Sequence, residues 1–161
     1  MLLVVGWGEL FLKSKIPNAV LNVCHAINEV IIIDDDPVHH FICKKQISNL
    51  DYQVQIRNFY NASEALLFLK DRNIGHLSPE RCLIFLDLNM PIMDGLQFLK
   101  HYQDLNKNIR VNYHLIILTS SILSSERLNA LYFSELKGYY TKPLKPETLK
   151  MILEGVYSLE C

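Results

Sequence analysis

Residues 30–37 read VIIIDDDP: four consecutive β-branched residues, then three aspartates and a proline. A β-branched run without polar alternation is typical of a strand that is buried on both faces of a parallel sheet. Two similar runs follow along the chain, CLIFL at 82–86 and HLIIL at 114–118. Weaker strand patterns cover 53–57 and 138–140. The sequence therefore predicts five short strands.

Helical patterns separate these strands. Apolar residues within 62–69 follow the i, i+3, i+4, i+7 spacing of an amphipathic helix, and a second set with this spacing lies within 149–156. Weaker helical patterns cover 37–49, 95–106 and 124–134. Strands and helices thus alternate, and right-handed crossovers place such helices on both faces of an open parallel sheet. We predict an α/β fold of three layers, α/β/α, around a five-stranded parallel sheet.

The composition limits the class of protein. The chain has 161 residues, 50% of them apolar, and 17 acidic residues against 16 Lys and Arg give a formal charge of −1. This length suits one globular domain, and the balanced charge argues against nucleic acid as the main partner. The 4 cysteines form no C-x-x-C pair, so neither a disulfide framework nor a zinc site is indicated. We expect a cytoplasmic protein.

The first part of the chain is expected to lie outside the main fold. Residues 1–28 show weak helical periodicity, and we assign the main domain to 29–161. The longest uncharged run there, Met1–Gly8, is far shorter than the ~20 apolar residues of a membrane span. We therefore expect no membrane association. A misplaced start codon, a loosely packed tail and a docking arm remain alternatives for this extension.

Polar side chains follow four of the predicted strands. Asp34–Asp36 follow the first strand, Asp87 the third and Thr119 the fourth, and Lys142 comes after the fifth. Chemistry in open parallel sheets collects beyond the carboxyl ends of the strands, so we expect these residues to converge on one rim. Helix capping or solvated loop charges would explain each residue separately, but not all of them together.

Closely packed carboxylates repel one another unless a cation joins them. Oxygen ligands of this kind suit Mg²⁺, which commonly binds one or two carboxylates together with phosphate oxygens. Lys142 offers a positive charge and Thr119 a hydrogen-bond donor to a phosphoryl group. A carboxylate at the centre of such a site can itself be the nucleophile, which gives an aspartyl-phosphate.

Four motifs carry a resemblance to a known family. They are IIIDDDP at 31–37, LDLNMPIMDG at 86–95, LTS at 118–120 and GYYTKP at 138–143. With these motifs, the chain resembles the receiver domain of two-component response regulators over about residues 29–158. The resemblance implies the flavodoxin-like strand order 2-1-3-4-5. It also implies a stand-alone receiver that is no enzyme beyond its own phosphorylation and dephosphorylation.

The resemblance assigns a role to each residue of the rim. Asp87 is the expected phosphoacceptor, which takes its phosphoryl group from a phosphohistidine of a histidine kinase or phosphotransfer protein. Asp34 and Asp35 are expected to hold Mg²⁺ with Asp87 and the backbone carbonyl of Asn89. Thr119 is then expected to hydrogen-bond the phosphoryl group, and Lys142 to pair with it; the Lys142-Pro143 bond is expected to be cis.

The resemblance also implies how a signal leaves the site. Tyr139 occupies the family's aromatic switch position, and its ring should turn inward when Thr119 moves toward the phosphoryl group. This motion would change the surface of the fourth helix, fifth strand and fifth helix, where a downstream protein is expected to bind. Tyr140 is expected on the other side of its strand. Gly95 is expected to open the third helix.

Three acidic or imidazole side chains beside the first strand need separate assignments. We expect Asp36 to be a loop or cap residue, with metal ligation less favoured. His39 and His40 are expected to line the partner-facing rim, because a phosphodonor histidine normally belongs to a helical bundle that is absent from this chain.

Two alternative functions fit parts of the pattern. A phosphatase resembling the haloacid dehalogenase superfamily would use Asp34 as nucleophile and Asp36 as acid, but it gives Asp87 no role and needs further acids after Lys142. A pseudo-receiver would be a binding module that works without phosphorylation. Every expected catalytic position carries the expected residue type, which favours an active receiver.

Overall fold

The computed structural model of the protein describes residues 27–72, 81–120 and 124–154, and the rest of the expected 1–28 extension lies outside these residues. Helices and strands alternate along the described chain, as the sequence predicts. In chain order the elements are β1 (Ile27–Ile33), α2 (Pro37–Asn49), β2 (Gln55–Phe59), α3 (Ala62–Asp71), β3 (Arg81–Leu86), α4 (Gly95–Gln103), α5 (Lys107–Arg110), β4 (Tyr113–Thr119), α6 (Ser124–Leu131), β5 (Leu136–Thr141) and α7 (Pro146–Leu153).

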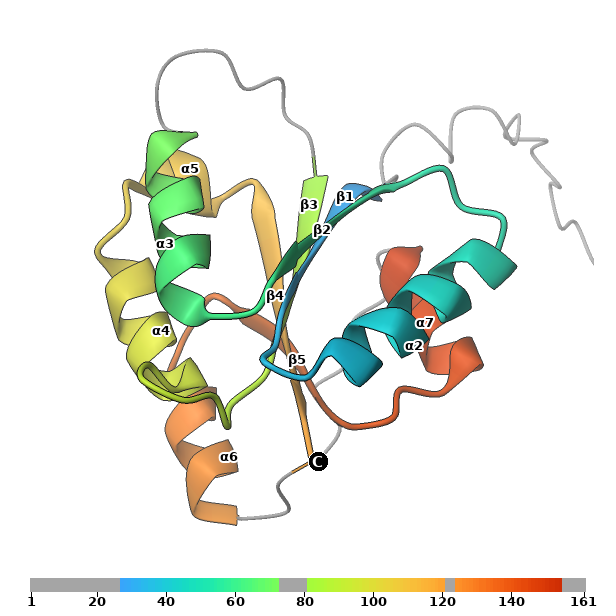
Figure 1. Cartoon of the computed structure of the whole chain (residues 1–161). Coiled ribbons are helices and arrows are strands. Elements are labelled where there is room, and N and C mark those ends of the chain that lie inside the picture. Colours follow the sequence, from blue (N-terminus) through green and yellow to red (C-terminus); the bar gives the residue numbers. More distant parts are fainter. Residues whose placement is uncertain (1–26, 73–80, 121–123, 155–161) are drawn as a thin grey trace, which may run out of the picture.

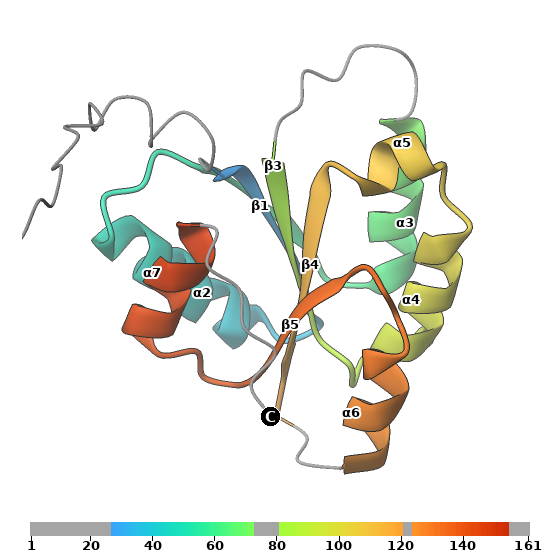
Figure 2. The ribbon, with the colours of Figure 1, turned by 180° about the vertical axis from the view of Figure 1, so that it is seen from behind.

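The five strands form one parallel sheet in the order β2-β1-β3-β4-β5. Helices α3, α4, α5 and α6 cover one face, and α2 and α7 cover the other (Figures 1 and 2). The predicted fold class, its three layers and the order 2-1-3-4-5 are therefore confirmed. Among the described residues, no helix is long and apolar enough to cross a membrane.

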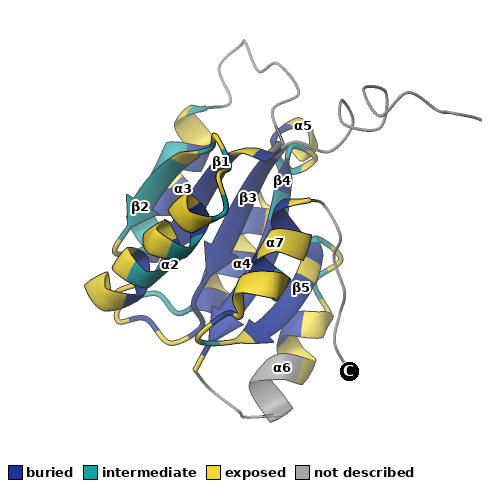
Figure 3. Ribbon diagram, turned by 90° about the vertical axis from the view of Figure 1, so that its right-hand side faces the viewer, coloured by how far each residue is buried: buried dark blue, intermediate teal, exposed yellow. Residues whose placement is uncertain are grey.

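Strands β1, β3, β4 and β5 are largely buried, whereas the edge strand β2 is of intermediate burial (Figure 3). Ile31 and Ile33 of β1 belong to the apolar cluster under α3 and α4, whereas Val30 and Ile32 belong to the cluster under α2 and α7. All four side chains are fully buried. Burial of each such side chain contributes about 1.5–3 kcal/mol, so an uninterrupted β-branched run is what a strand covered on both sides requires.

Several element boundaries differ from the sequence prediction; β5, for example, covers Leu136–Thr141 and not only 138–140. Strand β2 lies two residues later than predicted, because its pairing with β1 continues to the Ile33–Phe59 pair at the carboxyl end. Strand β1 begins at Ile27, two residues before the expected domain boundary. The chain after α4 forms the extra helix α5, which begins where the Asn106 side chain accepts a hydrogen bond from the Asn108 N–H at 2.9 Å.

Side-chain caps fix where the two helices beside the carboxyl edge of β1 and β3 begin. The Asp36 carboxylate accepts the Val38 N–H at 2.8 Å and so caps α2, which confirms its expected role as a cap residue. Asp94 caps α4 in a capping box with Gln97. Such caps contribute about 1 kcal/mol each and hold the loops after β1 and β3 in place.

Gly95 opens α4, as the sequence predicts, because the loop after β3 passes too close for a side chain. A Cβ atom at this position would lie 2.8 Å from the Cα of Leu88 and against the carbonyl oxygen of Asp87. The Gly95 N–H donates to the Leu88 carbonyl at 2.9 Å. The helix start is therefore pressed onto the backbone that carries Asp87.

We predict that Gly95→Ala destabilises the protein by about 1–3 kcal/mol, because the contacts of the new methyl group are with backbone that has no room to move. Urea denaturation followed by circular dichroism measures this loss. Lys100→Ala, at an exposed position of the same helix, is the control and should change the free energy of unfolding little. Equal stability of Gly95→Ala and wild type would contradict the close approach.

Candidate functional site

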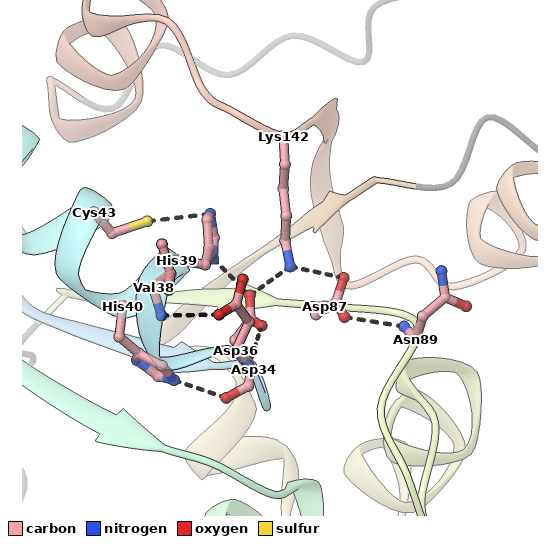
Figure 4. Close-up of polar contacts among 9 residues, drawn as sticks. All are labelled: Asp34, Asp36, Val38, His39, His40, Cys43, Asp87, Asn89 and Lys142. Atoms are coloured by element: carbon pink, nitrogen blue, oxygen red, sulfur yellow. Dashed lines mark hydrogen bonds and ion pairs between the residues drawn. The ribbon is translucent and has the colours of Figure 1, made fainter.

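Four strand ends meet at one rim of the sheet. Asp34 follows β1, Asp87 follows β3, Thr119 ends β4, and Lys142 follows β5. A pocket of about 410 Å³ opens there and is lined by Asp34, Asp87, Lys142 and neighbouring loop residues. The expected convergence of the acids and the lysine is therefore found. Figure 4 shows them together with His39, His40 and Asn89.

The carboxylates of Asp34, Asp35 and Asp87 line this pocket. One oxygen from each of Asp34, Asp35 and Asp87 lies within 4.8 Å of the others. Asp34 is 1% exposed and Asp87 5% exposed, whereas Asp35 is exposed. Like charges this close are costly when buried, and a divalent cation with oxygen ligands relieves that cost. The residues therefore fit a Mg²⁺ site.

Lys142 supplies the nearest positive charge. Its Nζ atom lies 2.5 Å from Asp34 Oδ2 and 3.1 Å from Asp87 Oδ1. The backbone N–H of Lys142 donates to the backbone carbonyl of Thr119 at 2.9 Å, which holds the lysine beside the end of β4. The Lys142-Pro143 peptide bond is cis, as expected. One ammonium group is thus shared between two buried carboxylates.

The environments of the two buried carboxyl groups push their pKa values apart. Burial raises the pKa of Asp34, but hydrogen bonds from His39, Lys142 and the Asp36 N–H outweigh burial and lower this pKa to about 2. Burial also raises the pKa of Asp87, and Lys142 offsets only part of that rise. Divergent pKa values in one pocket are characteristic of groups with different chemical roles.

Asp87 has few hydrogen-bond donors. Its Oδ2 accepts the Asn89 N–H at 3.2 Å. Its Oδ1 is buried, and its one partner among the described residues is the shared Lys142 ammonium, at 3.1 Å. A buried carboxylate oxygen with so few donors is costly, and either a cation or a new covalent bond would satisfy it.

Thr119 and Tyr139 lie on the same side of the sheet. Thr119 is buried at the end of β4, and Tyr139 pairs with Ile117, two residues earlier on that strand. Alternate residues of a strand share a face, so Thr119 and Tyr139 both face the α3 and α4 side. Tyr139 is buried in this apolar cluster, and Tyr140 lies in the opposite one, as predicted.

Both histidines after β1 are buried, and only one of them lines the pocket at the rim: His39 does so, as expected, whereas His40 is not among the lining residues. His39 is 5% exposed and His40 2% exposed. His39 Nδ1 lies 2.5 Å from Asp34 Oδ2, and His40 Nε2 lies 2.7 Å from the Asp34 carbonyl oxygen. The burial could have been read from the sequence, because His40 stands three residues before Cys43 and seven before Ile47 on the buried face of α2.

The loop after β3 contains a further residue that the sequence analysis missed. Ile92 has a φ of 71° and is 96% exposed. A β-branched residue in left-handed backbone is a conformational outlier. The motif gave no sign of it, because backbone conformation here depends on the turn into α4 and not on side-chain pattern.

The geometry also bears on the phosphatase alternative. That reading requires Asp36 as an acid in the pocket. Asp36 does line the pocket, but its Oδ1 accepts a hydrogen bond from the Val38 N–H and caps α2, so this oxygen is engaged at the helix start. Asp87, which has no role in such a phosphatase, lies instead beside Asp34 and Lys142.

The strand order and the acidic pocket with its lysine define the class of α/β protein that the motifs indicate. The family model of the response regulator receiver domain matches residues 30–154. The chain therefore belongs to the family of response regulator receiver domains.

Regulators and sensor kinases are both among its relatives. The chain is 27% identical over 127 residues to the two-component response regulator ARR11 of Arabidopsis thaliana, a match that covers 79% of this chain and 22% of that protein. It is 30% identical over 131 residues to the sensor histidine kinase CheAY of Helicobacter pylori, covering 81% of this chain and 15% of that protein. The chain thus spans only a minor part of these relatives.

Solved structures share the fold. The response regulator receiver protein of Dyadobacter fermentans is 26% identical, with a TM-score of 0.69, and the match covers 80% of this chain and 96% of that one. The receiver domain of the sensor histidine kinase PA1611 of Pseudomonas aeruginosa, which has a magnesium ion coordinated in its active-site cleft, is 22% identical with a TM-score of 0.62. That match covers 81% of this chain and 97% of the receiver domain.

We predict opposite effects of two amide substitutions on thermal stability without metal. The pKa of Asp87 is raised in the folded protein, so its ionisation opposes folding, and Asp87→Asn should raise Tm at pH 7. The pKa of Asp34 is lowered to about 2, so its ionised form stabilises the fold above its ordinary pKa of 3.8, and Asp34→Asn should lower Tm at pH 7.

Melting curves with a chelator, recorded from pH 7 down to pH 3, measure both effects. The rise in Tm caused by Asp87→Asn should shrink as the pH falls, because Asp87 of the wild-type protein then becomes protonated in both the folded and the unfolded state. The deficit in Tm of Asp34→Asn should persist down to about pH 3.8 and begin to shrink below it, because Asp34 is then protonated in the unfolded protein but still ionised in the folded one. Shifts of the same sign for the two variants would contradict the separation of the pKa values.

Proposed function

We propose that Asp87 accepts a phosphoryl group from a phosphohistidine of a histidine kinase or histidine phosphotransfer protein. A carboxylate oxygen of Asp87 attacks phosphorus, the phosphorus–nitrogen bond breaks, and the donor imidazole leaves and keeps the electron pair. The observation that carries this proposal is the buried carboxylate of Asp87, whose Oδ1 has only the Lys142 ammonium, at 3.1 Å, as a partner among the described residues.

The acidic cluster fits Mg²⁺ as the cofactor. Asp34, Asp35 and Asp87 would hold the ion together with the backbone carbonyl of Asn89. When bound, it supplies positive charge against the carboxylates and the phosphoryl oxygens. Three carboxylate oxygens within 4.8 Å of one another support this set, and the magnesium-bound receiver domain of PA1611 provides a parallel.

Lys142 and Thr119 stabilise the transferred group in this proposal. Lys142 already lies between Asp34 and Asp87, so its ammonium can follow the charge that the phosphoryl group brings to Asp87. Thr119 ends the neighbouring strand and offers a hydroxyl donor. Positioning and charge neutralisation are the main demands of phosphoryl transfer, and these residues meet both.

The switch couples this site to the surface of α6, β5 and α7. Tyr139 on β5 shares a sheet face with Thr119 and is buried in the apolar cluster under α3 and α4, which supports this coupling. In this proposal, phosphorylation draws Thr119 toward Asp87 and stabilises the inward position of the Tyr139 ring. The exposed apolar residues Leu128, Leu131 and Tyr132 of this face support contact with a downstream protein and not with nucleic acid.

Free thiols at Cys43 and Cys82 support a cytoplasmic setting.

We predict that a small acyl phosphate with Mg²⁺ labels Asp87. The product should be an acid-stable, base-labile adduct of one phosphoryl group, measured by intact mass, and peptide mapping should locate it. Asp87→Asn should abolish the adduct, and Asp36→Asn should retain it because Asp36 only caps α2.

Each alternative function predicts a different result. An adduct on Asp34 would support the phosphatase reading and contradict the proposal. No adduct on wild-type protein, under conditions where Mg²⁺ binds, would support a pseudo-receiver.

Tyr139→Leu is predicted to leave phosphorylation of Asp87 unchanged and to reduce the response of the α6, β5 and α7 surface. The leucine fills much of the buried space but lacks the ring. Backbone amide NMR spectra before and after phosphorylation measure the response. Tyr139→Phe keeps the ring and is the control, with shifts like those of wild type. Equal shifts in Tyr139→Leu would show that the ring does not carry the signal.

A further inference from the structure

His39 is a buried imidazole in the first turn of α2, between the acidic pocket and the helix interior. Its Nδ1 atom lies 2.5 Å from Asp34 Oδ2, and its Nε2 atom lies 3.4 Å from the Cys43 sulfur, one helical turn further on (Figure 4). Both ring nitrogens therefore have partners. The ring is fixed from the pocket side and from the helix side.

The direction of these hydrogen bonds follows from the two neighbours. Asp34 Oδ1 accepts the Asp36 N–H, and its Oδ2 lies 2.5 Å from the Lys142 ammonium, so this group is a carboxylate that only accepts, and His39 Nδ1 is the donor. Burial raises the pKa of the Cys43 thiol to about 12, so the sulfur beside Nε2 is a thiol and not a thiolate. A chain of polar contacts thus runs from Cys43 through His39 to Asp34.

Asp34 Oδ2 has two donors, one that also contacts Asp87 and one that does not. Lys142 Nζ lies 2.5 Å away but is shared with Asp87, whereas His39 contacts Asp34 alone among the carboxylates. The other oxygen, Oδ1, accepts the Asp36 N–H at 3.0 Å. When a phosphoryl group on Asp87 draws Lys142 toward itself, His39 is the side-chain donor that remains on Asp34.

We propose that His39 is a positioning residue for the cation site: its Nδ1–H holds the Asp34 carboxylate in the orientation that binds Mg²⁺. This inference rests on the proposed function for the identity of the ion. Donors that orient a liganding carboxylate typically change metal affinity by about 10–100-fold when they are removed. His39 acts through Asp34 and does not itself contact the ion.

Isothermal titration calorimetry of the full chain with MgCl₂ tests this inference. In His39→Leu, Asp34 loses its donor, and the Kd for Mg²⁺ should rise about tenfold or more. In His39→Asn, the amide nitrogen stands at the place of Nδ1, so the donor is kept and the contact with Cys43 is lost. This variant should bind Mg²⁺ nearly as tightly as wild type.

Two further variants complete the comparison. His39→Gln places its amide nitrogen at the position of Nε2, so it keeps a polar chain of similar size but loses the donor to Asp34. It should bind as weakly as His39→Leu, and it replaces that variant if leucine prevents folding. His101→Leu removes an exposed histidine of α4 and should leave the Kd unchanged. Circular dichroism melts of all variants show whether each is folded at the titration temperature.

The outcomes separate this inference from the proposed function. A wild-type Kd in folded His39→Leu or His39→Gln overturns the role of His39. Equally weak binding by His39→Asn and His39→Leu also overturns it, because packing and not the donor would then set the affinity. Absence of an Asp87 adduct in wild-type protein that binds Mg²⁺ overturns the proposed function instead, and leaves the Kd comparison intact.

Discussion

The parallel pairing of β1 with β3 forces two buried carboxylates together. Ile33 pairs with Leu86, so the next residues, Asp34 and Asp87, leave neighbouring strands side by side. Adjacent strands lie about 4.8 Å apart, and no rotation of the backbone separates the two side chains without breaking the sheet. The repulsion is therefore built into the fold. The shared lysine and the divergent pKa values are consequences of it, and so is a set of carboxylate oxygens that fits a cation.

The two carboxylates differ in how many hydrogen-bond donors stabilise their charge. Asp34 accepts hydrogen bonds from His39, Lys142 and the Asp36 N–H, which stabilise its ionised form. Asp87 receives one backbone N–H and a longer contact with the shared ammonium. A carboxylate with many donors is a well-anchored ligand but a poor nucleophile, because its lone pairs are already engaged. The carboxylate with few donors is the one that gains most from a new bond, and in this site that carboxylate is Asp87.

The sequence predicted most of what depends on local pattern. The β-branched run at 30–33 indicated a strand covered on both faces, and the motif around Asp87 indicated which residues would meet at the sheet edge. Strand β2 was placed two residues too early, because its position is set by pairing with β1 and not by its own half-polar sequence. The burial of His39 was missed because a histidine near a helix start reads as polar surface. Only the packing of α2 against the sheet turns it toward Asp34.

The position of β5 bears on the proposed coupling between Asp87 and the surface. Strand β5 is at one edge of the sheet and is hydrogen-bonded to a single neighbour, β4, with an irregular register between Leu115 and Ile116. It is thus held less firmly than β1 or β3, which are paired on both sides. Lys142 directly follows β5, and Tyr139 and Tyr140 on this strand pack into opposite apolar clusters. On the proposed function, a displacement of the lysine toward a charge on Asp87 would therefore act on an edge strand that contacts both helical layers.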